Sequence, residues 1–200
     1  MFRRLRAPSL SGLGLQQLRS DLARRRHRHR QFVTIAYVLL LSVVGLPQRA
    51  PALFWPGVAL VFAGEAVRLW ASGHVNKDRV LATTGPYAFV RHPLYVGNNV
   101  IVAGFCLASG RWWSFPLWLA LALAFFPPAI AHEDALLHRL FGSAWEEWSA
   151  RTRALVPRLG RYRPGMGGAW SLRQSLRVNG EPLIVVFLCG CLYLLHLKLA

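Results

Sequence analysis

The chain has 200 residues, of which 54% are hydrophobic and 16% are charged. This balance is too apolar for an ordinary soluble domain of this length and favours a membrane protein. Lys and Arg outnumber Asp and Glu by 24 to 8, but no aromatic residue interleaves with the basic run 24–30, as a surface that stacks nucleic-acid bases requires. The three cysteines lie in apolar stretches without metal-type spacing, which excludes a disulfide framework and a zinc module. We therefore expect one membrane domain that binds neither nucleic acid nor metal.

Five apolar stretches predict five transmembrane helices: 32–47, 52–71, 94–109, 112–131 and 182–199. The second, fourth and fifth are long enough alone, because crossing a hydrocarbon core of about 30 Å takes about 20 helical residues. The first and third must recruit flanking residues, let arginines snorkel, or lie where the bilayer is thinner. The expected fold class is all-α, a polytopic membrane protein with about five transmembrane helices.

The basic residues predict the orientation of these spans. Of the 24 Lys and Arg residues, nine precede residue 32, three lie in 72–93 and eight lie in 132–181. Five spans that start inside place all three groups on the cytoplasmic face, where such residues are enriched. The other face then receives only Arg49, Arg111 and Lys198. A cleaved signal peptide is the weaker interpretation, because the basic region before the first span is long and no A-x-A site follows neatly.

The second span carries two charged residues, Glu65 and Arg68, which share a helix face at this spacing. Charges inside a bilayer are costly and are typically partnered and functional. The alternative is that Arg68 snorkels near the cytoplasmic end and Glu65 only neutralises it. The spacing leaves both interpretations open.

The next loop, 84–97, combines turn signals with polar and aromatic side chains. Gly85 and Pro86 indicate a turn, and Pro93 suits the first turn of the third span, which places His92 near the helix N-cap. A polar, aromatic-lined pocket at the membrane surface is expected from the side chains of Tyr87, Arg91, His92 and Tyr95.

An acidic pair, Glu133 and Asp134, follows the fourth span at the start of an apolar stripe with helical period. Gly142 is expected to end this helix, and Ser143 with Glu146 fits a capping box that starts another, whose tryptophans face inward or into the interface. The alternative is an amphipathic helix pair on the bilayer surface. Adjacent acids point about 100° apart, so they are not an acid–base couple, but they suit a cation.

These motifs resemble the isoprenylcysteine carboxyl methyltransferase family, within a wider group of membrane methyltransferases that includes phospholipid N-methyltransferases. The resemblance covers about residues 64–157. Two blocks carry it: Gly85, Pro86, Tyr87, Arg91, His92, Pro93, Leu94, Tyr95, Val96 and Gly97, then Glu133, Asp134, Phe141, Gly142, Trp145, Trp148 and Pro157. The chain departs from the family at Asp134, where a second glutamate is usual, and at Trp145 and Trp148, where tyrosines are usual.

The resemblance implies S-adenosylmethionine as cofactor, held by a helical region on the cytoplasmic side. The implied binding residues are Tyr87, Arg91, His92, Pro93, Tyr95, Gly97, Glu133 and Asp134. Glu133 and Asp134 suit the ammonium and sulfonium, and His92 with Arg91 suits the carboxylate or the adenine edge. The tyrosines pack on the adenosine or orient His92.

The implied reaction is methyl transfer to a lipophilic acceptor that arrives from the membrane lipids, as in isoprenylcysteine carboxyl O-methylation. Glu65 and Arg68 are the candidate catalytic residues. For a carboxylate acceptor, Arg68 holds the nucleophile and Glu65 orients Arg68; for an amine acceptor, Glu65 takes the proton. A prenylcysteine carboxylate, a phospholipid amine and a small thiol all stay open as acceptors, as does the oligomeric state.

Two hypotheses of other classes accompany this one. Sterol reductases, which use a nicotinamide cofactor, share an Arg-His-x-Asn-Tyr-x-Gly pattern, but Pro93 and Leu94 replace its Asn-containing step and the chain is too short. A non-catalytic lipid-binding or assembly protein keeps the same scaffold. The expected organisation is a basic cytoplasmic tail (1–31), a membrane methyltransferase core (32–157), a basic cytoplasmic connector (158–181) and a C-terminal transmembrane helix (182–200).

Overall fold

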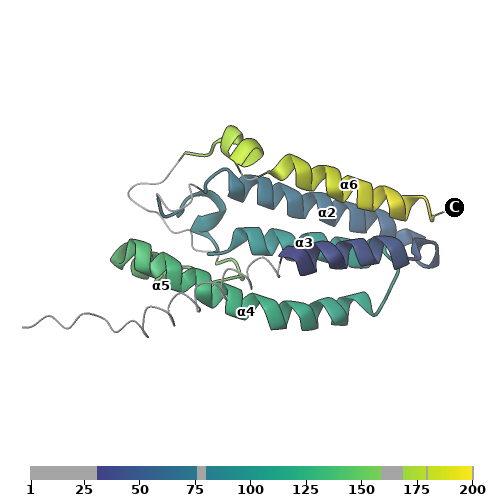
Figure 1. Cartoon of the computed structure of the whole chain (residues 1–200), viewed down its shortest axis with the longest axis horizontal. Helices are drawn as coiled ribbons and strands as arrows, with labels where there is room; N and C mark the ends of the chain where they lie inside the picture. The colour runs from purple at the N-terminus through teal and green to yellow at the C-terminus, as the bar shows by residue number, and fades with distance from the viewer. Residues whose placement is uncertain (1–30, 76–79, 159–168, 179, 200) are drawn as a thin grey trace, which may run out of the picture.

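The computed structural model describes residues 31–75, 80–158, 169–178 and 180–199 (Figure 1). The basic run 24–30 lies outside these residues. Within them all regular secondary structure is helical, and one isolated β-bridge joins Val90 and Arg153. The helices are Gln31–Val44, α2 (Pro51–Ser72), α3 (Pro93–Ala108), α4 (Ser114–Phe141), α5 (Ser143–Arg151) and α6 (Glu181–His196). Short helical turns are η1 (Pro47–Arg49), η2 (Gly85–Ala88) and η3 (Gln174–Val178).

The fourth helix differs most from the sequence-based expectation. The predicted span 112–131 and the predicted acidic helix form one helix, α4, which continues through Pro127 and Pro128 to Phe141. Residues 129–141 include no glycine or proline, so nothing ends the helix before Gly142, which has a φ of 52° and is the expected C-cap. The predicted capping box is wrong: Gly142 is also the N-cap of α5, and no side chain caps that helix.

Glycines bring α2 and α3 into close contact. A Cβ added to Gly57 would lie 2.6 Å from the carbonyl oxygen of Gly104, and one added to Gly64 would lie 2.7 Å from that of Gly97. The earlier glycine of α2 meets the later glycine of α3, so the two helices are antiparallel. Small residues at such positions let helix backbones approach closely, as they do in membrane helix pairs.

The outer surface of the bundle is apolar. By length and composition, α2 and α4 can each cross a membrane, and the shorter apolar helices Gln31–Val44, α3 and α6 run alongside them (Figure 1). Large side chains such as Leu123 on α4 and Leu183 on α6 are 65% and 78% exposed. Apolar surface on this scale indicates contact with lipid or with another apolar surface.

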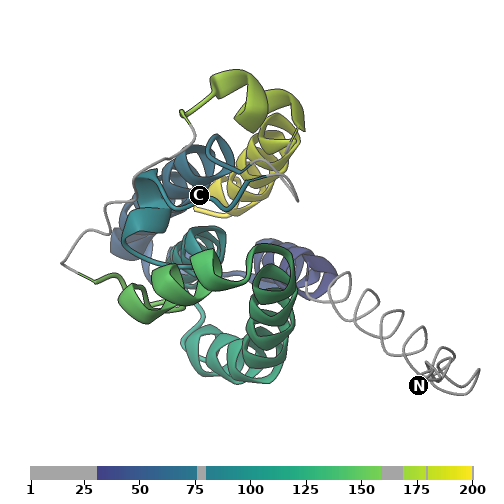
Figure 2. The same ribbon diagram turned by 90° about the vertical axis from the view of Figure 1, so that its left-hand side faces the viewer.

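The helices alternate in direction, so the loops gather at two ends. One end holds the close of α2, η2, the start of α3, the close of α4, and α5 (Figure 1), and Figure 2 shows this end facing the viewer. At the opposite end, Arg111 Nε donates to the carbonyl of Val44 and Lys198 Nζ to that of Ser42, each at 2.8 Å. These cations satisfy carbonyl groups that a helix end leaves unpaired.

Candidate active site

Backbone hydrogen bonds fix the first motif block beside the chain that follows α5. Arg91 N donates to the carbonyl of Arg153 at 2.8 Å, and His92 N to that of Ala154 at 3.1 Å. His92 is the N-cap residue of α3, and Pro93 occupies its first turn, as predicted. Proline loses no hydrogen bond there, because the first N–H groups of a helix have no partner within the helix.

The two motif blocks meet in a group of five side chains that we call the His92 cluster: Arg91, His92, Tyr95, Glu133 and Asp134. His92 Nε2 lies 3.1 Å from Asp134 Oδ1, and Arg91 Nη2 donates to Asp134 Oδ2 at 3.3 Å. Tyr95 Oη donates to Glu133 Oε2, which lies 3.7 Å from His92 Nδ1. His92 is buried, whereas the Glu133 side chain is 40% exposed, so one carboxylate of the cluster faces outward.

Aromatic rings form one wall of the His92 cluster. The rings of His92 and Tyr95 stack with centroids 5.2 Å apart, and Tyr95 stacks in turn on Phe126 at 5.7 Å. Beneath them the buried Trp148 donates from Nε1 to the carbonyl of Tyr87 at 3.0 Å. Burial raises the pKa of the Tyr87 hydroxyl, which therefore stays protonated. The rings of His92, Tyr95 and Phe126 therefore give the cluster a flat aromatic side.

Arg91 supports the cluster and also leaves a donor unused. Its Nη1 donates to the carbonyls of Thr152 at 2.7 Å and Ser149 at 3.1 Å, which ties the cluster to the end of α5. Arg91 Nε is buried without a hydrogen-bond partner, and so is Nε1 of Trp145 on α5, which packs with Tyr87 and Trp148. Buried donors are normally satisfied, so these two need an explanation, such as a ligand.

A second group, the Arg68 cluster, consists of Glu65, Arg68, Asn98 and Glu181. Arg68 Nη1 donates to Asn98 Oδ1 at 2.6 Å, and Nη2 lies 3.1 and 3.0 Å from the two carboxylate oxygens of Glu181. Arg68 Nε lies 3.4 Å from Glu65 Oε2, close enough for an ion pair, but the geometry makes no hydrogen bond. One guanidinium therefore stands between two carboxylates.

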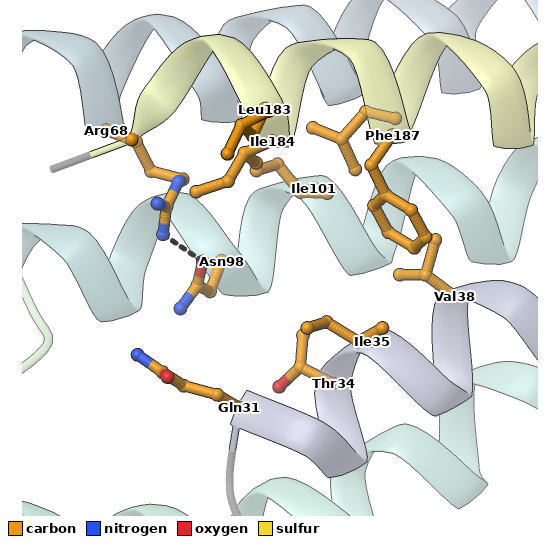
Figure 3. A pocket seen from close by; sticks show the side chains of 12 residues that line it. Gln31, Thr34, Ile35, Val38, Arg68, Asn98, Ile101, Leu183, Ile184 and Phe187 are labelled. Atoms are coloured by element: carbon orange, nitrogen blue, oxygen red, sulfur yellow. Dashed lines mark hydrogen bonds between the residues drawn. The ribbon is translucent and has the colours of Figure 1, made fainter. Parts of the chain in front are cut away.

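A cavity of about 500 Å³ opens beside Arg68. Figure 3 shows Arg68 and Asn98 at one side, Gln31 and Thr34 of helix Gln31–Val44 below them, and apolar side chains of α3, α6 and helix Gln31–Val44 around the remainder. The lining residues are Gln31, Thr34, Ile35, Val38, Arg68, Asn98, Ile101, Gly180, Leu183, Ile184, Phe187 and Leu188. A polar end and an apolar body suit an amphipathic molecule.

The two clusters lie on consecutive turns of α3. Tyr95 belongs to the His92 cluster and Asn98 to the Arg68 cluster, and residues three apart on a helix are surface neighbours. The arrangement gives a polar, partly open site next to an amphipathic cavity.

The structure brings together five of the eight predicted cofactor-binding residues, those of the His92 cluster. Tyr87 precedes them in the same loop, where its carbonyl accepts from Trp148, and Pro93 begins α3. Gly97 lies elsewhere: it packs against α2, where an added Cβ would be 2.6 Å from Arg68 Cγ. Glu65 and Arg68 do share a helix face and pair, but in the Arg68 cluster.

Asn98 and Glu181 are the two site residues that the sequence analysis missed. Asn98 was detectable as an amide in the middle of an apolar span. Glu181 directly precedes the last apolar stretch, and nothing in its spacing indicates that it pairs with a residue 113 positions earlier. Within the described residues, no group of three or more His, Cys, Asp or Glu side chains is arranged to hold a metal ion.

The chain is similar to known proteins over the segment that carries both clusters. A family model described as phospholipid methyltransferase matches residues 54–144, which include every member of the two clusters except Glu181. The protein-S-isoprenylcysteine O-methyltransferase of Schizosaccharomyces pombe is 33% identical over 99 residues, which are 50% of this chain and 42% of that protein.

Two bacterial relatives carry other names. The nickel-cobalt-cadmium resistance protein NccN of Alcaligenes xylosoxydans xylosoxydans is 36% identical over 141 residues, 66% of this chain and 64% of that protein. The cobalt-zinc-cadmium resistance protein CzcN of Cupriavidus metallidurans is 38% identical over 112 residues, 54% of this chain and 49% of that protein.

The matches thus span less than two thirds of the length of these three relatives. No solved structure matches the chain. The segment that matches the family model contains the whole His92 cluster and all of the Arg68 cluster except Glu181. Over less than half of its length the chain is thus similar to phospholipid methyltransferases, and it is also similar to protein-S-isoprenylcysteine O-methyltransferases.

Proposed function

We propose that the protein is an integral-membrane methyltransferase that uses S-adenosylmethionine and acts on a lipophilic acceptor, as the isoprenylcysteine carboxyl O-methyltransferases named among its relatives do on theirs. The observation that carries this proposal is the His92 cluster, in which two motif blocks about 40 residues apart in sequence form one site. The amphipathic cavity on the next turn of α3 supports a lipophilic acceptor.

The His92 cluster fits the chemical groups of S-adenosylmethionine. Glu133, a carboxylate that is partly exposed, suits the ammonium or the sulfonium. The orphaned donors Arg91 Nε and Trp145 Nε1 suit acceptor atoms of the carboxylate or the adenine. The flat pair of His92 and Tyr95 suits an adenine face. When bound, the cofactor supplies an electrophilic methyl group.

The residues of the chain contribute orientation and exclusion of water. Asp134 holds both Arg91 and His92, so it positions two groups of the cofactor site at once. The Arg68 cluster holds the polar head of the acceptor, and the apolar side chains of α6 hold its body. Alignment of two reactants in a closed site is worth about 7–11 kcal/mol of barrier in favourable cases, so a strong base is not required.

The proposed topology has five transmembrane helices, with the N-terminus and the His92 cluster on the cytoplasmic side. The grouping of Lys and Arg in the sequence supports this orientation, because the described residues 80–93 and 132–158 reach the same end of the bundle (Figure 1). Arg111 and Lys198 lie at the other end. A water-soluble cofactor then approaches through the loops, and the acceptor enters from the bilayer.

Transfer of a labelled methyl group tests the proposal. Purified protein in phospholipid nanodiscs is incubated with methyl-labelled S-adenosylmethionine and, separately, extracted lipids, prenylcysteine analogues and small thiols. We expect label in a lipophilic product, and loss of that label in His92→Ala and Glu133→Ala. Glu147→Ala, an exposed position on α5, is the matched control. The proposal fails if no acceptor is labelled, or if both site variants transfer as well as the control.

A further inference from the structure

A short stretch before α6 takes no part in the proposed methyl transfer. It comprises residues 169–178, which we call the η3 segment, and it lies at the edge of the bundle beside the start of α6 (Figure 1, Figure 2). It lies outside the residues 54–144 that match the family model. Because α2 and α6 are apolar helices, a bilayer that surrounds them meets water near the level of this segment.

Hydrogen bonds hold the η3 segment against the C-terminal end of α2. Oγ of the buried Ser175 donates to the carbonyl of Leu69 at 3.0 Å and lies 2.5 Å from Ser72 Oγ. Gln174 Nε2 donates to the carbonyl of Val75 at 2.6 Å. One side of η3 is therefore fixed on the bundle, and the side chains on its other side are held in place.

The free side of the η3 segment combines apolar and cationic side chains. Leu172 and Leu176 are exposed, and so are Arg173 and Arg177. These four side chains line one shallow hollow of about 460 Å³. Trp170, which is also exposed, lies near the start of the segment. Apolar and basic side chains side by side, with tryptophan close to them, are typical of segments that lie in a membrane interface.

No carboxylate of the described residues neutralises the two arginines of the hollow. None of the ion pairs among these residues includes Arg173 or Arg177. The acid nearest to them in sequence, Glu181, has a side chain that is 2% exposed and pairs with Arg68. A guanidinium group matches the geometry of a phosphate, which it binds through two parallel hydrogen bonds. The hollow therefore presents two cations to an external anion.

We propose that the hollow of the η3 segment binds anionic phospholipids of the surrounding bilayer. Arg173 and Arg177 hold the phosphate, and Leu172 and Leu176 contact the start of the acyl chains. A soluble phosphate suits the hollow less well, because the leucines stay in water when it binds. This lipid is not the proposed methyl acceptor, since the hollow shares no lining residue with the cavity beside Arg68.

Two properties distinguish this hollow from general attraction between a basic protein and an anionic membrane. The contacts of Gln174 and Ser175 fix the segment beforehand, so little conformational freedom is lost when a lipid binds. The leucines also add apolar burial to the attraction that each arginine supplies near an anionic surface. The site therefore depends on Arg173 and Arg177 in particular, and not on the net charge of the protein.

A pair of double variants tests this dependence. Arg173→Gln with Arg177→Gln removes both cations of the hollow and leaves its leucines in place. Arg139→Gln with Arg158→Gln is the matched control, because it removes two exposed arginines from α4 and from the chain after α5. The two proteins have the same net charge. Thermal unfolding in detergent confirms that each of them is folded.

The experiment counts bound lipids in the absence of a methyl donor. Full-length protein in nonionic detergent is titrated with dioleoylphosphatidylglycerol and with dioleoylphosphatidylcholine, and native mass spectrometry measures the affinity for each lipid. Phosphatidylglycerol is anionic and has no amine, thiol or carboxylate. We expect the unmodified protein and the control variant to prefer phosphatidylglycerol by about tenfold. In the variant of the hollow we expect the preference to fall to within about twofold.

The single variants and a soluble phosphate give two further measurements. Arg173→Gln and Arg177→Gln should each lower the preference by about threefold, because each removes one of the two cations. Excess glycerol 3-phosphate should leave phosphatidylglycerol bound, because it lacks acyl chains to contact the leucines.

The inference is overturned if the unmodified protein binds both lipids equally, if the variant of the hollow keeps the preference, or if the control variant loses it. Displacement of phosphatidylglycerol by glycerol 3-phosphate overturns it as well, since the hollow then recognises phosphate alone. All of these results are independent of methyl transfer. A preference that depends on the two arginines stands even if no acceptor is methylated, and methyl transfer without this preference refutes the lipid site alone.

Discussion

Glu133 and Asp134 are adjacent acids in one cluster, and the structure predicts that their neutral variants fail in different ways. Asp134 accepts from Arg91 at 3.3 Å and lies 3.1 Å from His92, with its side chain 17% exposed. Hydrogen bonds to charged groups contribute about 1.5–3 kcal/mol each, and asparagine keeps part of the contact, so we expect Asp134→Asn to destabilise the fold by about 1–3 kcal/mol. That loss lowers the unfolding midpoint by about 2–4 °C per kcal/mol for a chain of this length.

Glu133→Gln leaves the fold nearly unchanged, because the amide oxygen still accepts from Tyr95 and the side chain is 40% exposed. We expect a change in stability within about 0.5 kcal/mol. Its affinity for S-adenosylmethionine falls by about tenfold to hundredfold, because a charge-assisted contact to the cofactor is lost. Thermal unfolding in nanodiscs and titration calorimetry with the cofactor measure the two quantities. The reasoning is refuted if Glu133→Gln destabilises the free protein and binds the cofactor with unchanged affinity.

Three further substitutions test the packing and the division between the two clusters. Gly104→Ala places a Cβ 2.6 Å from a backbone oxygen of α2 and should destabilise the protein by about 1–3 kcal/mol in chemical unfolding, whereas Gly190→Ala, with open space around it, should not. Trp148→Phe removes the donor to the carbonyl of Tyr87 and should cost about 1–3 kcal/mol by the same measurement; an unchanged midpoint would show that this bond does not hold the site together. Arg68→Gln should abolish labelled-methyl transfer and leave cofactor affinity within about twofold in calorimetry. Loss of both transfer and cofactor affinity would show that the two clusters act as one binding site.

Most of the helical architecture could be predicted from the sequence, because apolar length and turn residues are local signals. The expected start of α3 near Pro93 and the expected end of the acidic helix at Gly142 are confirmed. Both signals are local, because proline and a glycine with positive φ set the conformation of their own backbone. The predicted fourth span, 112–131, already included Pro127 and Pro128, but its continuation into the acidic helix as far as Phe141 was not expected. A change from apolar to charged residues does not by itself end a helix, so the sequence does not show whether two helical stretches are joined.

The candidate site, too, could be predicted from the sequence only in part. The meeting of His92 with Asp134 could be anticipated, because the count of basic residues placed both motif blocks on one face. The pairing of Glu181 with Arg68 could not, because it depends on how α6 packs against α2, and no periodicity or spacing encodes that contact. Gly97 was assigned to the cofactor through its motif, whereas its position is explained by the close approach of α2.

The most direct test of the central claim is a map of the residues that contact the cofactor. Full-length protein in nanodiscs is irradiated with a labelled azido-adenosyl analogue of S-adenosylmethionine, with excess S-adenosylmethionine as competitor, and the labelled peptides are sequenced. The account predicts competable label in both the segment 85–97 and the segment 133–148, which supply the His92 cluster. Label confined to one of these segments, or found in neither, would contradict the claim that the two motif blocks hold one cofactor.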